Sequence, residues 1–229
     1  MSNIVLGGGG NDIQASNVYQ HFTAALPNNK NLLFLPQASA PRLRTFAQTW
    51  DRISNSAPFR DCHIRMWESL ANRSYVDLDR FDGICLFGGN TYDLLDTLIE
   101  TGFADLLAQF ISDERPLLGI SAGAIVLGRD VTTEGVASDP DKNLGGITDL
   151  TGLDLVGGYN VHCHYEPSED EDLSEYSIRH NVPFFAIPET AGVAVTGSSA
   201  RTLGPGEVHL FRNGVHEVLG SSASVTLGT

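Results

Sequence analysis

The first half of the chain alternates short apolar runs with segments of helical spacing, and this alternation restricts the fold more than any other feature. GICLFGG (83–89) is apolar on both faces, as strands in the middle of a parallel sheet are. Repeated strand–helix–strand units predict a doubly wound, mostly parallel α/β sheet with helices on both faces. The other strand-like runs are NIVLG (3–7), NLLFLPQAS (31–39), HIRMWES (63–69) and RPLLGIS (115–121), and helical spacing is seen over 12–26, 42–54 and 91–110 with a break at Gly102.

The last third of the chain has a different pattern. AGVAVTG, GEVHLFRNG and VHEVLG are short β-like stretches separated by Gly and Asn-Gly turns. Such turns connect antiparallel strands, so we expect antiparallel strands or hairpins at the sheet edge. Neither an internal repeat nor a low-complexity linker is present, and we expect residues 1–229 to form a single domain.

Composition narrows the classes of partner. The 229 residues carry a formal net charge of −14, from 28 acidic and 14 basic side chains, which disfavours nucleic acid and anionic membrane surfaces as partners. No apolar run is long enough to cross a bilayer, and the N-terminus lacks the features of a signal peptide. Three scattered cysteines suit a reducing compartment, so we expect a cytoplasmic protein. We expect a monomer or a homodimer, and the sequence does not choose between them.

Ser121 lies in the sequence GISAG (119–123), which fits the pattern G-x-S-x-G. A strand-like run precedes the serine and a small-residue helix start follows it, which is the context of a nucleophile elbow. The free N–H groups of the following helix turn face the site of a developing oxyanion. We favour a catalytic role for Ser121 over the alternative, in which the motif only allows tight packing between the strand and the helix.

A nucleophilic serine needs a base and an orienting carboxylate. In GYNVHCHYEP, His162 and His164 are two residues apart on a strand-like run, so both are expected on one face. Glu189 follows another strand and is expected at the same rim as the elbow. The order Ser121, His164, Glu189 therefore competes with an α/β-hydrolase order, in which Glu189 precedes His209 or His216.

Four segments together resemble peptidase E, the aspartyl dipeptidase family of serine peptidases, whose fold is similar to class I glutamine amidotransferases. They are FGGNTYDLLDTLIETGFADLL (87–107), GISAGAIVLG (119–128), GLDLVGGYNVHCHY (152–165) and AIPETAGVAV (186–195). Gly-Gly-Asn-Thr followed by a Ser-Ala-Gly-Ala elbow is far more specific than the elbow alone.

The resemblance implies Ser121 as nucleophile, His164 as general base and Glu189 as its orienting acid. His164 is preferred to His162 because the family's base precedes an aromatic residue, here Tyr165. The resemblance also implies an oxyanion hole formed by backbone N–H groups of Gly89 or Asn90 together with Ala122. Glycines at the end of a strand allow such close donors, although Gly88 and Gly89 also fit a simple strand-to-helix turn.

The segment between His164 and Glu189 departs from the family. Relatives bind the substrate's acidic residue with an arginine there, whereas this chain has EPSEDEDLSEYSIRH, with Ser174 aligned to that arginine. Asp-X specificity is therefore in doubt, and the acidic residues favour either a free amino group or a simple solvated helix face. Tyr165 and Arg179, the only arginine of the segment, are the candidate substrate-binding residues.

No metal and no cofactor are expected. Cys163 should point away from its two neighbouring histidines, and GGGGND (7–12) lacks the spacing of a phosphate-binding loop, so it is interpreted as a flexible rim. We predict a serine hydrolase that cleaves short peptides through an acyl-enzyme. The alternatives are an esterase or amidase with the α/β-hydrolase order, and a non-catalytic amidotransferase-like binding domain.

Overall fold

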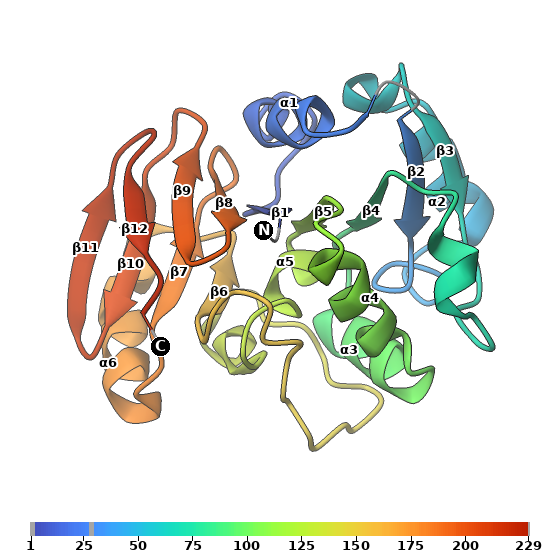
Figure 1. Cartoon of the computed structure of the whole chain (residues 1–229). Helices are drawn as coiled ribbons and strands as arrows, with labels where there is room; N and C mark the ends of the chain where they lie inside the picture. The colour runs from blue at the N-terminus through green and yellow to red at the C-terminus, as the bar shows by residue number, and fades with distance from the viewer. Residues whose placement is uncertain (1–2, 28–29, 229) are drawn as a thin grey trace.

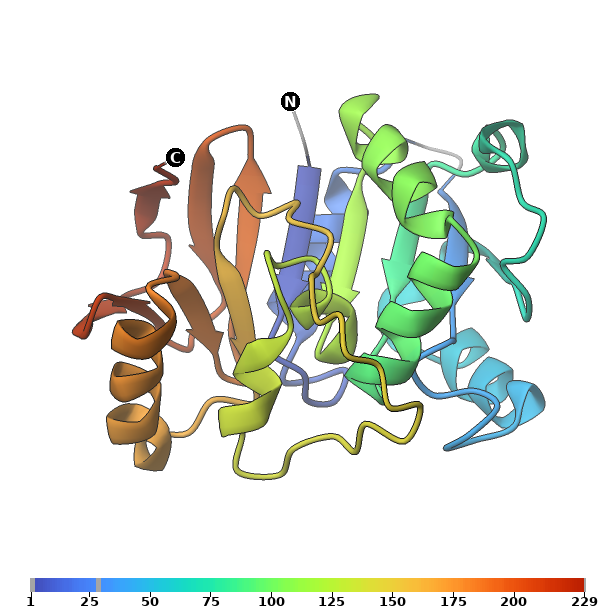
Figure 2. The same ribbon diagram turned by 90° about the horizontal axis from the view of Figure 1, so that it is seen from below.

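The protein is described by a computed structural model that covers residues 3–27 and 30–228. Its main element is an eight-stranded sheet (Figures 1 and 2). The strands β1, β5, β4, β2 and β3 are parallel, and β8, β9 and β12 continue the sheet in antiparallel fashion beside β1. Across the sheet the order is β12 (Ser224–Thr226), β9 (Ser199–Leu203), β8 (Gly192–Thr196), β1 (Asn3–Gly7), β5 (Leu117–Ile120), β4 (Gly83–Leu86), β2 (Asn31–Leu35) and β3 (His63–Met66).

Helices cover both faces of this sheet. Figure 1 shows α1 (Ser16–Ala24) on one side, with α3 (Thr91–Glu100), α4 (Phe103–Ser112) and α5 (Ala122–Ile125) on the other. The apolar cluster on the α1 face includes Ile53 of α2 (Phe46–Ser54) and Phe59 of the 3-10 turn Ala57–Phe59. The central strands β4 and β5 are buried throughout, which explains their continuous apolar sequence. The predicted α/β fold with a mostly parallel sheet is confirmed.

A second sheet, which the sequence did not predict, holds the strands on either side of the acidic segment. Its order is β11 (Val215–Leu219), β10 (Val208–Arg212), β7 (Phe184–Ile187) and β6 (Asn160–Cys163), with β6 and β7 parallel. One face of this sheet contributes to the main apolar cluster, and α6 (Asp170–His180) packs on the other face through Leu173 and Tyr176. The expected antiparallel edge is confirmed for β8, and β9 and β12 extend it with strands that the sequence did not predict. The predicted β10–β11 hairpin belongs to this second sheet.

Local sequence signals set where the helices begin and end. α2 starts at Phe46, later than residue 42, because Thr45 and Gln48 form a reciprocal capping box. α3 and α4 are separated at Gly102, whose left-handed φ of 67° only glycine adopts readily. The remaining short turns are 3-10 helices at Tyr75–Leu78, Thr132–Val136 and Pro167–Glu169.

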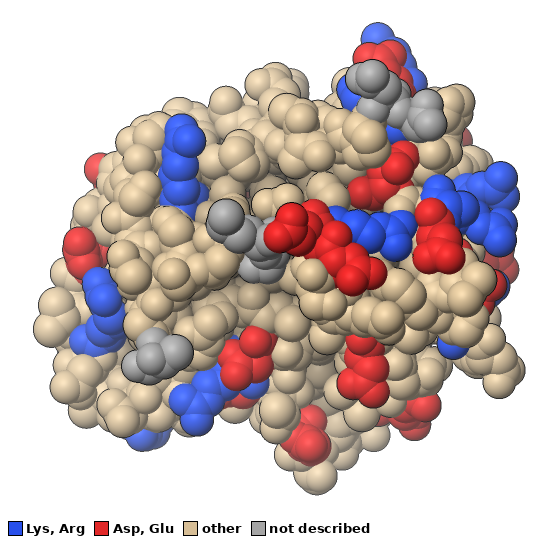
Figure 3. Space-filling view, viewed as in Figure 1, with Lys and Arg blue, Asp and Glu red and all other residues tan. Residues whose placement is uncertain are grey.

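Charged side chains are distributed without a continuous basic surface on the face seen in Figure 3, where Lys and Arg lie in separate groups interrupted by Asp and Glu. This agrees with the acidic net charge of −14. Within residues 3–27 and 30–228, no helix combines the length and apolar character that crossing a bilayer requires.

Candidate active site

Ser121 stands at the sharp turn between β5 and α5. Its φ of 53° and ψ of −122° are unusual for a residue with a side chain, as expected for a nucleophile elbow. The two motif glycines permit the close packing of this turn. A Cβ on Gly123 would lie 2.1 Å from the Leu86 carbonyl oxygen, and one on Gly119 would lie 2.5 Å from the Gly123 carbonyl oxygen. The packing against neighbouring backbone thus holds the serine in its strained conformation.

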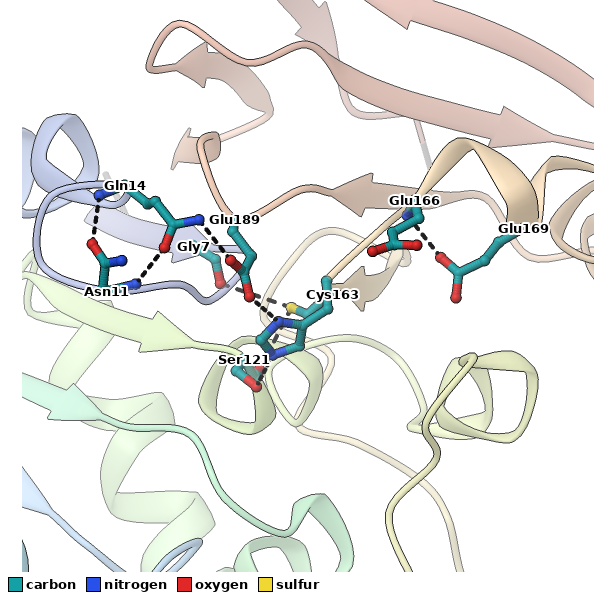
Figure 4. Close-up of polar contacts among 9 residues, drawn as sticks. Gly7, Asn11, Gln14, Ser121, Cys163, Glu166, Glu169 and Glu189 are labelled. Atoms are coloured by element: carbon teal, nitrogen blue, oxygen red, sulfur yellow. Dashed lines mark hydrogen bonds and ion pairs between the residues drawn. The ribbon is translucent and has the colours of Figure 1, made fainter.

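The three residues expected to form a triad lie together. Ser121 Oγ is 2.8 Å from His164 Nε2, and His164 Nδ1 is 3.1 Å from Glu189 Oε1 (Figure 4). The imidazole lies between the hydroxyl and the carboxylate, as a general base and its orienting acid require. The side chains of His164 and Glu189 are 52% and 41% exposed, so the arrangement is open to a substrate.

His162 and His164 do not share a strand face, contrary to the expectation. β6 ends at Cys163, and His164 has a positive φ of 56°, so the backbone turns and the alternation stops. His162 is buried, and its Nε2 lies 3.2 Å from Glu169 Oε2. Burial alone would raise the pKa of Glu169, but hydrogen bonds from His162 and from the backbone of Glu166 and Ser138 outweigh it and lower this pKa to about 2. The two histidines thus have different partners, and His164 is the one beside Ser121.

The four-glycine stretch after β1 packs against His164, a role that the sequence did not reveal. A Cβ on Gly9 would lie 2.2 Å from Cε1 of His164, so only glycine leaves room for this ring. The backbone N–H of His164 also donates a hydrogen bond to the Gly8 carbonyl at 2.9 Å. The stretch was interpreted as a flexible rim, but in the structure it packs closely against the imidazole of His164.

Gln14 is a second residue that the sequence did not reveal. Its Nε2 donates to Glu189 Oε2 at 2.8 Å, and its Oε1 accepts the backbone N–H of Asn11 at 3.0 Å (Figure 4). Both carboxylate oxygens of Glu189 are thus engaged, one by His164 and one by Gln14. The loop between β1 and α1 therefore fixes the orientation of the acid.

Backbone donors for an oxyanion lie next to Ser121. The end of β4 approaches the elbow so closely that a Cβ on Gly88 would lie 3.2 Å from Ser121 Oγ. Within the described residues, the N–H groups of Gly89 and Ala122 donate to no protein acceptor. Asn90 requires a correction, because its N–H donates to the Ala38 carbonyl at 2.6 Å and is not free, while its side chain caps α3.

The two candidate substrate-binding residues are not at the elbow. Tyr165 is buried against α6, and its hydroxyl donates to Asp170 Oδ1 at 2.7 Å. Arg179 lies on the exposed side of α6, 3.8 Å from Glu175, and lines a separate surface depression with Asp172. Tyr165 was chosen because it follows His164, and Arg179 because it is the only arginine of the segment; β6 ends at Cys163 and the chain turns away from Ser121 after it.

The histidines of the alternative triad order are also remote. His209 Nδ1 and His216 Nε2 lie 2.8 Å apart across the β10–β11 hairpin, and His216 is 3.6 Å from Asp170. Within the described residues, Asp170, His209 and His216 are the set close enough to share a metal ion, whereas His162 and His164 point to different partners. The two cavities that contain Ser121 and His164 are lined by neither His209 nor His216.

Similarity to known proteins agrees with this arrangement. The family model for peptidase family S51 matches residues 4–203. A peptidase E from Pasteurella multocida is 30% identical over 146 residues, which cover 58% of this chain and 59% of that protein. A Drosophila melanogaster protein named "Probable alpha-aspartyl dipeptidase" is 28% identical over 217 residues, covering 87% of this chain and 83% of that protein.

The fold is shared with solved structures. The crystal structure of a peptidase from an acI-B1 actinobacterium matches with a TM-score of 0.75 at 17% identity, over 99% of this chain and 97% of that chain. The family match extends over most of the chain and includes the strands and helices that carry Ser121, His164 and Glu189. The chain therefore belongs to peptidase family S51 and is a serine-type peptidase.

Proposed function

We propose that Ser121, His164 and Glu189 are the catalytic triad of a dipeptidase that cleaves short peptides. The observation that carries this proposal is the continuous contact from Ser121 Oγ to His164 Nε2 at 2.8 Å and from His164 Nδ1 to Glu189 at 3.1 Å. Ser121 Oγ attacks the carbonyl carbon of the scissile amide while its proton passes to His164. The N–H groups of Gly89 and Ala122 stabilise the oxyanion.

The tetrahedral intermediate collapses when the C–N bond breaks and His164 gives its proton to the leaving amine. The acyl group remains as an ester on Ser121. His164 then takes a proton from a water molecule that attacks this ester, and the proton returns to Ser121 as the acid product leaves. Glu189 holds the imidazole tautomer and stabilises its positive charge, with Gln14 keeping the carboxylate in place.

Replacement of single histidines tests this assignment. We expect His164→Ala to lower kcat by about a thousandfold or more, because the base acts as a unit with the nucleophile. His216→Ala is the matched control, since this histidine contacts His209 and not Ser121. A fluorophosphonate should label the wild type and His216→Ala but not Ser121→Ala. Full activity in His164→Ala would contradict the triad.

The substrate of the proposed dipeptidase is not restricted to an amino-terminal aspartate. The segment that would meet this residue carries carboxylates, and Arg179 lies outside the cavity of Ser121. We expect a panel of Asp-X, Gly-X, Ala-X and Lys-X dipeptides to show no large advantage for Asp-X. If Asp-X were hydrolysed far faster than the others, this part of the proposal would be wrong.

We also place this peptidase in the cytoplasm. The support is that Cys62, Cys85 and Cys163 are all free thiols, as expected in a reducing compartment. Cell fractionation with an antibody against the chain would test the location.

A further inference from the structure

Ser121 lies between two cavities of opposite charge. The larger cavity, of about 690 Å³, includes Ser121 and His164 and has Arg44 and Arg52 in its lining. The smaller cavity, of about 380 Å³, shares Ser121 and His164. Its charged lining, apart from histidines, consists of carboxylates only, from Glu134, Asp139, Asp141 and Glu169. A dipeptide is a zwitterion, so this asymmetry distinguishes its two ends.

The two arginines of the larger cavity are both exposed to solvent. Within the described residues, no side-chain hydrogen bond or ion pair involves Arg44 or Arg52, although the neighbouring Arg42 is paired with Asp93. One acidic residue, Asp12, also lines this cavity, and it accepts a hydrogen bond from Ser56 Oγ at 2.9 Å. The cavity therefore has two exposed arginines that make no ion pair, beside one acidic residue, in a chain that is strongly acidic.

Thr49 adds an independent indication of a ligand. It lines the same cavity and is only 5% exposed, and its Oγ1 has no hydrogen-bond partner. Thr49 and Arg52 are three residues apart on α2, which places them on one face of the helix, and Arg44 directly precedes the helix cap Thr45. A buried hydroxyl without a partner is unfavourable, and an acceptor supplied by a ligand at this cavity would relieve that cost.

We propose that Arg44, Arg52 and Thr49 bind the α-carboxylate of the residue that leaves, so that the enzyme selects peptides ending one residue after the scissile bond. This inference rests on the proposed role of Ser121. Guanidinium groups and a hydroxyl are suitable donors to a carboxylate. The acidic cavity on the other side of Ser121 repels this carboxylate and accepts the α-ammonium group of the first residue. The opposite charges thus set the direction in which a dipeptide lies across the nucleophile.

The same cavity also favours an apolar leaving residue. Aromatic side chains of Tyr19, Phe34, Phe59 and Phe87 form part of its lining. Tyr19, Phe34 and Phe59 are at most 2% exposed, so a leucine or phenylalanine side chain would pack mainly against the partly exposed Phe87 while its carboxylate remains at α2.

Binding to the inactive variant Ser121→Ala tests the inference without requiring turnover. Calorimetry would compare Ala-Leu with Ala-Leu amide, which differ only in the terminal charge. We expect the amide to bind about 10- to 100-fold more weakly, the range for losing hydrogen bonds to a charged group. Equal affinity for the acid and the amide would overturn the inference.

Variants then locate the effect. In the Ser121→Ala background, replacing both Arg44 and Arg52 by Gln should weaken binding of Ala-Leu to the level of its amide and leave the amide unchanged. Arg60→Gln is the matched control, because Arg60 is an exposed arginine in the same region that lines a different depression. Thr49→Val should weaken Ala-Leu binding without lowering Tm, because it removes an unsatisfied buried hydroxyl.

Two further outcomes separate the possible errors. If the double arginine variant selectively weakened Asp-Leu amide relative to Ala-Leu amide, the arginines would bind an aspartate side chain, and the assignment to the leaving residue would be wrong. Fluorophosphonate labelling of each variant with Ser121 intact reports on the triad alone. If the enzyme is labelled but binds the dipeptide acid and its amide equally well, only this inference is wrong. If the wild type is not labelled at all, the proposed function is contradicted.

Discussion

The absence of a side chain at Gly9 leaves the space in which the imidazole of His164 lies beside Ser121. A methyl group at position 9 would collide with the imidazole, and the φ of Gly9, 122°, is also unfavourable for alanine. We expect Gly9→Ala to lower kcat by about 100-fold, which is the effect that a displacement of roughly 1 Å in an active site can have. Steady-state kinetics on a dipeptide measures this loss.

Gly102→Ala is the control for Gly9→Ala. It also replaces a glycine of positive φ, 67°, but nothing lies within 4 Å of the added methyl group. This variant should lose some stability and keep its kcat. If both alanine variants kept full activity, or lost it equally, the proposed support of His164 by Gly9 would be wrong.

At the scale of single residues, the sequence predicted the positions with recognisable local patterns and missed those that depend on distant contacts. Ser121 lies in a short motif, and His164 and Glu189 each follow a strand, so both were expected at the rim of the elbow. The preference for His164 over His162 came from the family resemblance. Gln14 and Glu189 are 175 residues apart in the chain, and no spacing rule connects them. Tyr165 was predicted to bind substrate because it follows His164 in the sequence. The positive φ of His164 turns the chain there, so that Tyr165 packs against α6 instead.

At the scale of secondary structure, Glu169 joins three elements beside the active site. Its carboxylate contacts His162 of β6, the N–H of Ser138 in the preceding loop and the N–H of Glu166 in its own turn. Its pKa is about 2 in the folded protein, against an ordinary value of 4.5. A depressed pKa stabilises the fold above pH 4.5, and this contribution is lost as the pH falls toward 2.

We therefore expect the wild type to lose on the order of 3 kcal/mol of unfolding free energy from this group between pH 4.5 and 2. Glu169→Gln should be less stable at pH 7, and its stability should change less over that interval. Urea unfolding at a series of pH values measures the difference. Glu171→Gln, an exposed neighbour, should follow the wild type, and equal pH dependence in Glu169→Gln would contradict the role given to Glu169.

The elements themselves show where pattern reasoning succeeds. Buried parallel strands such as β4 and β5 have continuous apolar sequences and were predicted, as was the Asn213-Gly214 hairpin turn, whose two residues have positive φ. The division of the strands into two sheets was not predicted. A strand pattern reports that a segment is extended and which of its faces is buried, but it does not name the neighbouring strand.

At the scale of the whole molecule, one apolar cluster connects the beginning and the end of the chain. It includes Ile4 of β1, Leu86 of β4, Val161 of β6 and Leu227 near the C-terminus. The proposed triad has the same distribution, because its three members come from the turn after β5 of the main sheet, the end of β6 in the second sheet and the loop after β7. We infer that the two sheets form a single domain, since separate unfolding of the second sheet would expose apolar surface of the main one.

Two buried thiols allow a direct test of this single domain. Cys85 lies in β4 of the main sheet, and Cys163 lies at the end of β6 in the second sheet. Both are buried, and burial raises the pKa of each thiol, so neither should react with a thiol reagent while its sheet is folded. Labelling with iodoacetamide over a urea series, followed by mass spectrometry of the two peptides, should give one common midpoint, because a two-state domain exposes both sites together. If Cys163 were labelled at clearly lower urea than Cys85, the second sheet would unfold on its own. His164 would then lie on a unit that can separate from Ser121, and activity would be lost with the exposure of Cys163 rather than with that of Cys85.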